Sequence, residues 1–174
     1  MRIGPSLALA QTLVVLSLFA GTAGAAPIAV TSTAIGAGRH FAARNTGYGA
    51  DLSPEVSWSA VPGARAFALV LDDPDAPGGR PFIHWLMWNI PVTRLAEGAV
   101  PAGARQGRND FGRVGYGGPH PPSGTHHYHL RVFALDAPLA LGAGGDQAAF
   151  AAALRGHVIA TGEVVGLASA PQSP

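Results

Sequence analysis

The chain has 174 residues, no cysteine, a formal net charge of +1 and only 12% charged residues, together with 24 glycines and 15 prolines. This length fits one domain that is large enough to bury its own hydrophobic core. The lack of cysteine excludes disulfides, thiolate metal sites, iron–sulfur clusters and a cysteine nucleophile. Because the net charge is near zero and the arginines form no basic run, the sequence also argues against nucleic-acid binding.

Residues 1–25 have the pattern of a secretory signal peptide. Arg2 is the only charged residue in this segment, and the apolar stretch 7–20 is shorter than the roughly 20 residues that a transmembrane helix needs. Small residues then lead to Ala25, after which we expect cleavage. The product is a single neutral domain over residues 26–174 that is periplasmic or secreted and has no transmembrane segment. The alternative is an uncleaved N-terminal anchor.

Short apolar runs separated by glycine and proline predict a mainly β domain with small helical additions. The clearest strands are residues 66–71, 82–90 and 126–135, and residues 157–167 are expected to form a closing strand. Segment 82–90 is apolar on both alternating faces, apart from His84. We therefore expect this strand in the middle of a sheet that is covered on both sides.

A long segment without periodicity, residues 94–125, lies between two of these strands and is rich in glycine and proline. Irregular segments of this length inside a compact domain are usually functional when they are ordered. One helix is expected, over residues 146–155, with Asp146 as its N-cap and Gly156 at its end.

The glycine-rich segment 112–119 matches no nucleotide-binding pattern, since it lacks the Gly-Lys-Ser/Thr ending of a phosphate-binding loop and the prolines that follow it prevent a helix. Ser123 precedes Gly124, but Pro121 stands where the nucleophile elbow of serine hydrolases has glycine. The sequence therefore argues against both chemistries.

Three histidines lie within four residues, at His126, His127 and His129. On a strand, His127 and His129 share one face while His126 points to the other, so the three cannot ligate one metal ion without a bulge. We expect no metal and no cofactor.

Four polar residues are placed at or near the ends of neighbouring predicted strands: Asp73, His84, His126 and Tyr128. Binding residues are often carried by such strand ends and the loops that follow them, so these side chains are candidates for one small cavity. The alternative is that His84 is a core histidine whose hydrogen bonds are satisfied and which has no further role.

Several segments, in the same order, resemble the phosphatidylethanolamine-binding protein family in its bacterial Raf-kinase-inhibitor-like branch. The resemblance includes the Asp-Pro-Asp-Ala-Pro sequence, the strand that contains His84, an Asn-Asp-Phe-Gly sequence and the long segment that ends at Tyr128. The segments concerned are residues 52–58, 73–77, 84–91, 109–112, 115–128 and 156–160.

This resemblance implies a large central antiparallel sheet, a smaller second sheet and one or two short helices. It also implies a pocket for phosphate-like anions. The pocket residues carried over from the family are Asp73, His84, His126 and Tyr128, with Pro77, Gly117, Gly118 and Pro119 as walls.

This chain departs from the family at two positions. The family commonly has arginine where this chain has His127, and bacterial members often have cysteine where this chain has His120. The first difference removes a permanent positive charge from the expected pocket, and the second places another titratable group near it.

The combined hypothesis is a non-enzymatic exported protein that binds phosphate or phosphoethanolamine-like head groups and acts on a protein partner through that binding. Two alternatives remain open. One is a hydrolase or lyase that uses Asp73 with His84 or His126 as an acid–base pair. The other is an interaction protein that inhibits a protease or a kinase.

Overall fold

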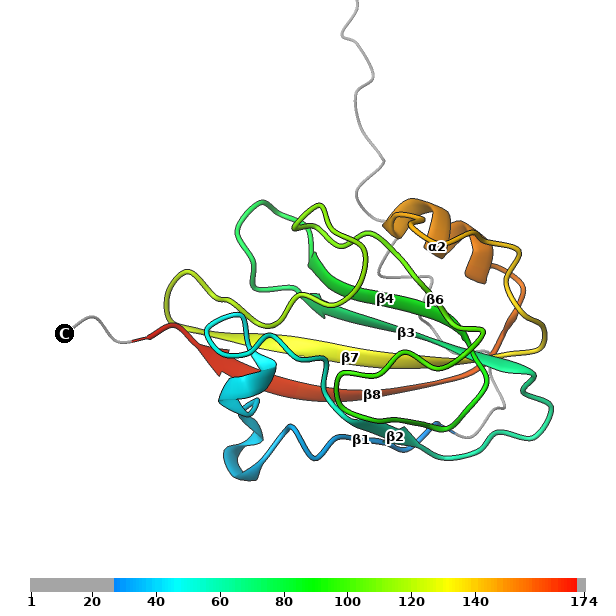
Figure 1. Cartoon of the computed structure of the whole chain (residues 1–174), viewed down its shortest axis with the longest axis horizontal. Helices are drawn as coiled ribbons and strands as arrows, with labels where there is room; N and C mark the ends of the chain where they lie inside the picture. The colour runs from blue at the N-terminus through cyan, green and yellow to red at the C-terminus, as the bar shows by residue number, and fades with distance from the viewer. Residues whose placement is uncertain (1–26, 172–174) are drawn as a thin grey trace, which may run out of the picture.

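The computed structural model describes residues 27–171, so the predicted signal peptide lies outside the described residues. Two antiparallel sheets form the domain (Figure 1), which confirms the expected mainly β fold with a larger and a smaller sheet. The smaller sheet has the strand order β1-β2-β5 and the larger one β6-β4-β3-β7-β8. The elements in chain order are β1 (Val30–Thr31), η1 (Ala37–Arg39), η2 (Ala43–Asn45), β2 (Val56–Trp58), β3 (Ala66–Asp73), β4 (Phe82–Ile90), β5 (Arg94–Leu95), β6 (Arg105–Gln106), β7 (Thr125–Leu135), α2 (Gln147–Leu154) and β8 (Val158–Ser169).

The four predicted strands are the long strands of the larger sheet. β4 has the predicted bounds, whereas β3 and β8 run two residues further than predicted, to Asp73 and Ser169. The helix is also confirmed, because the Asp146 side chain accepts a hydrogen bond from Ala149 N at 2.8 Å and Gly156 follows with a φ of 82°. Short apolar runs that are bounded by glycine and proline favour a buried strand over a helix.

Two expectations need correction. β4 is not the centre of the sheet: β3 is, and the outer neighbour of β4 is the two-residue strand β6. The segment 94–125 is also not wholly irregular, because it contains β5 and β6. Both strands are too short to leave a periodic pattern in the sequence.

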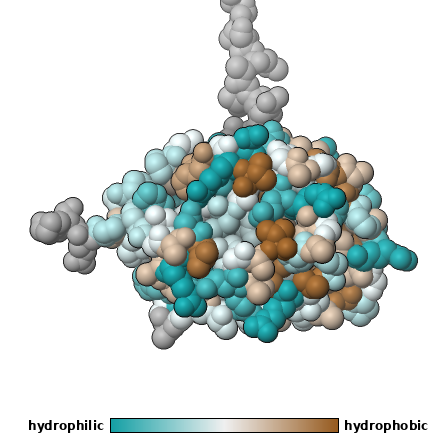
Figure 2. Space-filling model, in the orientation of Figure 1, coloured by the Kyte–Doolittle hydropathy of each residue, from teal (hydrophilic) through white to brown (hydrophobic). Residues whose placement is uncertain are grey.

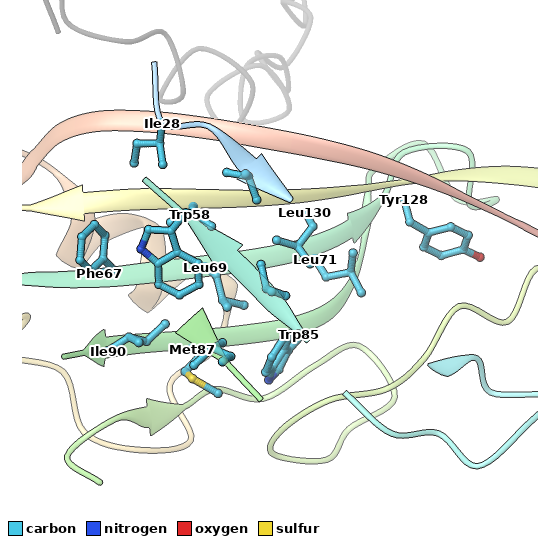
Figure 3. Close-up of a cluster of buried hydrophobic side chains, with 14 of the residues drawn as sticks. Ile28, Trp58, Phe67, Leu69, Leu71, Trp85, Met87, Ile90, Tyr128 and Leu130 are labelled. Carbon is cyan, nitrogen blue, oxygen red and sulfur yellow. The ribbon is translucent and has the colours of Figure 1, made fainter. Parts of the chain in front are cut away.

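Each face of the larger sheet carries its own hydrophobic cluster. One cluster fills the space between the two sheets (Figure 3), and the other lies under α2, where Phe150 and Leu154 meet the opposite face of the sheet. β4 contributes to both clusters, through Trp85 and Met87 on one face and Trp88 on the other. This explains why its sequence is apolar on both sides.

The antiparallel order brings three strand ends to the same edge of the domain. The end of β3, the start of β4 and the start of β7 all lie toward the left of Figure 1, opposite the helix α2. Polar residues at these ends are therefore neighbours in space although they are far apart in sequence.

β4 contains an extra residue at His84. Trp85 and Ile83 pair with consecutive residues of β3, so His84 between them has no partner there. A bulge of this kind re-aims side chains relative to the regular alternation. Ile83 packs in the cluster under α2, whereas His84 contacts the Tyr128 ring, whose own place is in the cluster between the sheets.

Glu55 holds the smaller sheet together by accepting hydrogen bonds from three segments. Its carboxylate receives the backbone N–H and hydroxyl of Thr33, the hydroxyl of Ser57 and the Nε of Arg94, at 2.6–3.1 Å. Burial by itself raises the pKa of Glu55, but the hydrogen bonds from Ser57, Thr33 and Arg94 outweigh burial and lower it to about 2.

Replacing this carboxylate, Glu55→Gln, is expected to lower the free energy of unfolding by about 1–2 kcal/mol at neutral pH. The pKa of Glu55 is depressed in the folded state, so its contribution is complete above pH 4.5 and is lost as the pH falls from 4.5 toward about 2. Urea unfolding of both proteins at neutral pH and near the acid end of this range measures the difference. A difference of the same size at both pH values would contradict the assignment.

Candidate functional site

A buried aspartate–histidine pair forms the centre of the candidate site. Asp73 at the end of β3 and His126 at the start of β7 are 3% and 9% exposed, and His126 Nδ1 lies 2.8 Å from Asp73 Oδ2. A carboxylate accepts, so His126 Nδ1–H is the donor and Nε2 is left for another partner. The other oxygen of Asp73 accepts the backbone N–H of Asp75 at 2.9 Å. The imidazole therefore has a fixed orientation.

His84 is oriented by backbone carbonyls. Its Nδ1 lies 2.7 Å from Gly117 O and 3.1 Å from Gly118 O. Because carbonyl oxygens only accept, Nδ1 carries the proton and Nε2 of the neutral ring presents a lone pair. Burial lowers the pKa of His84 below its ordinary value of 6.5, although the carbonyls and the Asp73 charge oppose this shift. His84 is thus a neutral acceptor at pH 7.

Tyr128 places a hydroxyl beside this pair. The residue is fully buried, and its hydroxyl makes no well-aligned hydrogen bond within the described residues, although the Asp73 side chain and the backbone N–H of His120 lie close enough to act on it. Figure 3 shows the hydroxyl directed away from the apolar side chains of the cluster between the sheets. Burial and then the Asp73 carboxylate raise the pKa of the phenol, so it keeps its proton and remains a donor.

The Gly-Gly-Pro segment lies directly against His84. Gly117 N–H donates to His84 O at 2.9 Å, while Gly118 N–H donates to Asp51 Oδ1 at 2.6 Å. A Cβ on Gly118 would lie 2.7 Å from backbone atoms of Thr46 and Gly47, so a side chain has no room there. The structure therefore brings Asp73, His84, Tyr128 and this segment together, as the sequence predicted.

The predicted wall residue Pro77 lies in the connection from β3 to β4, and its role as a wall stays a prediction. It is exposed, in the turn that this connection forms. Hydrogen bonds attach the turn to β7, because Asp75 Oδ2 accepts both the backbone N–H and the Nδ1–H of His127 at 2.7 Å.

The neighbouring histidines have separate partners. His127 binds Asp75, and His129 binds Glu163, with Nδ1 3.0 Å from Oε2, on the face opposite His126. Within residues 27–171 no three side chains of the metal-binding types are grouped so that they could hold an ion. Over the same range no helix is long and apolar enough to cross a bilayer.

A cavity of about 330 Å³ adjoins the cluster, and sequence reasoning missed it. It lies between the segment after η2 and the Asn-Asp-Phe-Gly and Gly-Gly-Pro sequences. The Asn-Asp-Phe-Gly sequence was one of the segments that resemble the family, but nothing in it indicated that its phenylalanine would line a cavity. The lining residues are Gly47, Asp51, Phe111, Arg113, Gly118 and His120.

These features define a mainly β domain of two antiparallel sheets with a buried polar cluster at one end of the larger sheet. The family model described as "Phosphatidylethanolamine-binding protein" matches residues 31–169. UPF0098 protein PH1269 of Pyrococcus horikoshii is 42% identical over 147 residues, which cover 78% of this chain and 74% of that protein. UPF0098 protein YbcL of Escherichia coli is 41% identical over 138 residues, covering 70% of this chain and 75% of YbcL.

Solved structures agree with the sequence comparison. The crystal structure of Escherichia coli YbcL, described as a new member of the mammalian PEBP family, matches with a TM-score of 0.77 and 36% identity, over 84% of this chain and 100% of that chain. CT736 from Chlamydia trachomatis matches with a TM-score of 0.78 and 35% identity, over 83% of this chain and 99% of that chain. The chain belongs to the phosphatidylethanolamine-binding protein family, as its sequence motifs indicated.

The close backbone contact at Gly118 provides a test of the site's geometry. Gly118→Ala is expected to lower the free energy of unfolding by about 1–3 kcal/mol, because the new Cβ would overlap backbone that cannot rotate away. Gly142→Ala is the matched control, since no atom lies within 4 Å of a Cβ at that position. Urea unfolding of both variants measures the effect, and equal stabilities would show that the Gly118 contact is wrong.

Proposed function

We propose that this protein binds a small phosphate-bearing head group, such as phosphate or phosphoethanolamine, at Asp73, His84, His126 and Tyr128. The observation that carries the proposal is the buried Tyr128 hydroxyl, which makes no well-aligned hydrogen bond within the described residues and lies beside the Asp73–His126 pair. A buried donor left unbonded costs roughly 1–3 kcal/mol, and a ligand oxygen would recover that cost. Membership of the family supports the same assignment.

The orientation of the two imidazoles makes this binding dependent on pH. Each Nδ1–H is already used, by Asp73 for His126 and by carbonyls for His84, so each neutral ring offers only a lone pair at Nε2. An anionic oxygen needs donors. Protonation turns Nε2 of His126 into a charged donor, whereas burial lowers the pKa of His84 and favours its neutral form, and the family's arginine is absent at His127. Anion binding should therefore strengthen as the pH falls from 8 to 6.

Calorimetric titration with phosphoethanolamine and inorganic phosphate tests this expectation. We expect affinity to rise by about tenfold between pH 8 and pH 6, and His126→Ala to remove most of that rise, since one charged hydrogen bond is worth about 1.5–3 kcal/mol. Tyr128→Phe should weaken binding at both pH values. Sulfate, whose charge is constant over this range, separates protonation of the protein from protonation of the ligand.

His129→Gln is the matched control, because His129 lies on the same strand but on the opposite face, against Glu163. A weak signal that is the same in the native protein, His126→Ala and His129→Gln would disprove the proposal.

The buried Asp73–His126 pair also favours a second candidate, an acid–base hydrolase or lyase. Turnover of a phosphate ester that is lost in Asp73→Asn would favour this candidate over simple binding.

We also propose export, with cleavage after Ala25 to give a mature chain of residues 26–174. The proposal rests on the single positive charge, the short apolar stretch and the small residues of the N-terminal segment. Expression of the full chain in a bacterium, followed by mass measurement of the periplasmic fraction, is expected to find a protein that begins at Ala26. A full-length chain confined to the membrane fraction would instead support an uncleaved anchor.

A further inference from the structure

The cavity beside the polar cluster has an arginine and a histidine in its lining. Arg113 and His120 are both exposed and come from the segment that leads into β7, facing the segment of Gly47 and Asp51. On the face seen in Figure 2, hydrophobic residues are scattered among polar ones rather than gathered into one continuous patch. The cavity that Arg113 and His120 line is therefore a better candidate for ligand binding than the open surface.

The cavity and the cluster share walls. Gly118, which lines the cavity, accepts from His84 Nδ1 through its carbonyl, and the ring of Phe111 lies edge-on at 5.3 Å from the His84 ring. The backbone N–H of His120 also acts on the Tyr128 hydroxyl, since it opposes the rise in the pKa of that phenol. A ligand held by the cluster therefore lies next to the cavity.

The donors in the cavity are largely unused. One Arg113 nitrogen, Nη2, binds Asp51, and the guanidinium carbon lies 5.7 Å from the centre of the Phe111 ring. Among the described residues, neither Nε nor Nη1 of Arg113 has a hydrogen-bond partner, and neither does either ring nitrogen of His120. His120 only packs edge-on against Tyr48, at 4.2 Å between ring centres.

We propose that this cavity is a carboxylate subsite, so that the protein prefers phosphate esters that carry a carboxylate next to the phosphate over esters that carry only an amine. The planar guanidinium of Arg113 matches a carboxylate in a two-pronged pair, and His120 can donate to the same group. Asp51 is the other charged residue of the lining, and it is already paired with Arg113 through Nη2, which leaves further N–H groups of the guanidinium for a ligand. This inference rests on the proposed function, which places the phosphate at the cluster.

Phosphoethanolamine and O-phosphoserine form the matched ligand pair, because they differ only by a carboxylate. Calorimetry at neutral pH is expected to find O-phosphoserine bound about tenfold more tightly, the effect of one charged hydrogen-bonded pair. Arg113→Gln should abolish this preference and leave the affinity for inorganic phosphate unchanged. Arg108→Gln is the control, because Arg108 lies in the same loop but binds Gly112 O and does not line the cavity.

The outcomes separate this inference from the proposed function. Equal affinity for the two esters would overturn the carboxylate subsite and leave the phosphate site standing. No binding of phosphate or of either ester would overturn both. A loss of inorganic phosphate binding in Arg113→Gln would place the phosphate itself in the cavity, which also contradicts the carboxylate assignment. A preference that survives in Arg108→Gln and disappears in Arg113→Gln supports it.

The same chemistry occurs in free O-phosphoserine and in the head group of phosphatidylserine. Sedimentation with vesicles that contain phosphatidylserine, compared with phosphatidylglycerol vesicles of the same charge, distinguishes the two sources. Binding of phosphatidylserine vesicles alone supports a lipid ligand, and binding of free O-phosphoserine without vesicle binding supports a soluble one. Equal binding to both kinds of vesicle would show that charge, not the carboxylate, is recognised.

Discussion

One extra residue in β4 turns His84 toward β7, and the polar cluster depends on that bulge. In a regular strand, His84 would lie on the face opposite its neighbour Trp85, with its imidazole away from the space between the sheets. Instead the ring contacts Tyr128 at 5.1 Å between centres, and its Nδ1 reaches the Gly-Gly-Pro carbonyls. The loop that bears Gly117 is thus attached to the sheet through the same imidazole that faces the site.

The electrostatic character of the site follows from what holds its side chains in place. His126 is held by a carboxylate and His84 by carbonyls, so both rings direct a lone pair outward when neutral. The adjoining cavity contains a permanent positive charge, on Arg113, whereas position 127 is a histidine. In the cavity, Arg113 is paired with Asp51, whereas the imidazoles of the cluster are held by Asp73 and by backbone carbonyls.

Sequence reasoning predicted the larger sheet and the cluster because both depend on local patterns. The long apolar runs, bounded by glycine and proline, favoured buried strands, and Asp73 and His126 stand at or next to the ends of two of them. The smaller sheet was expected only from the family resemblance, since strands of two or three residues have no periodicity of their own. The cavity depends on distant pairing, such as Gly47 N–H to Pro119 O, which no local pattern indicates.

The crowded backbone around Gly118 divides the recognition surface into a fixed part and a variable part. The glycine wall cannot accept a side chain, and Gly47 allows little more, since a Cβ there would lie 3.1 Å from the Cβ of His120. Arg113 and His120, by contrast, are exposed, and their side chains contact other side chains, Asp51 and Phe111 for Arg113 and Tyr48 for His120. A designer who wished to retarget this protein would thus keep the glycines and diversify those two positions.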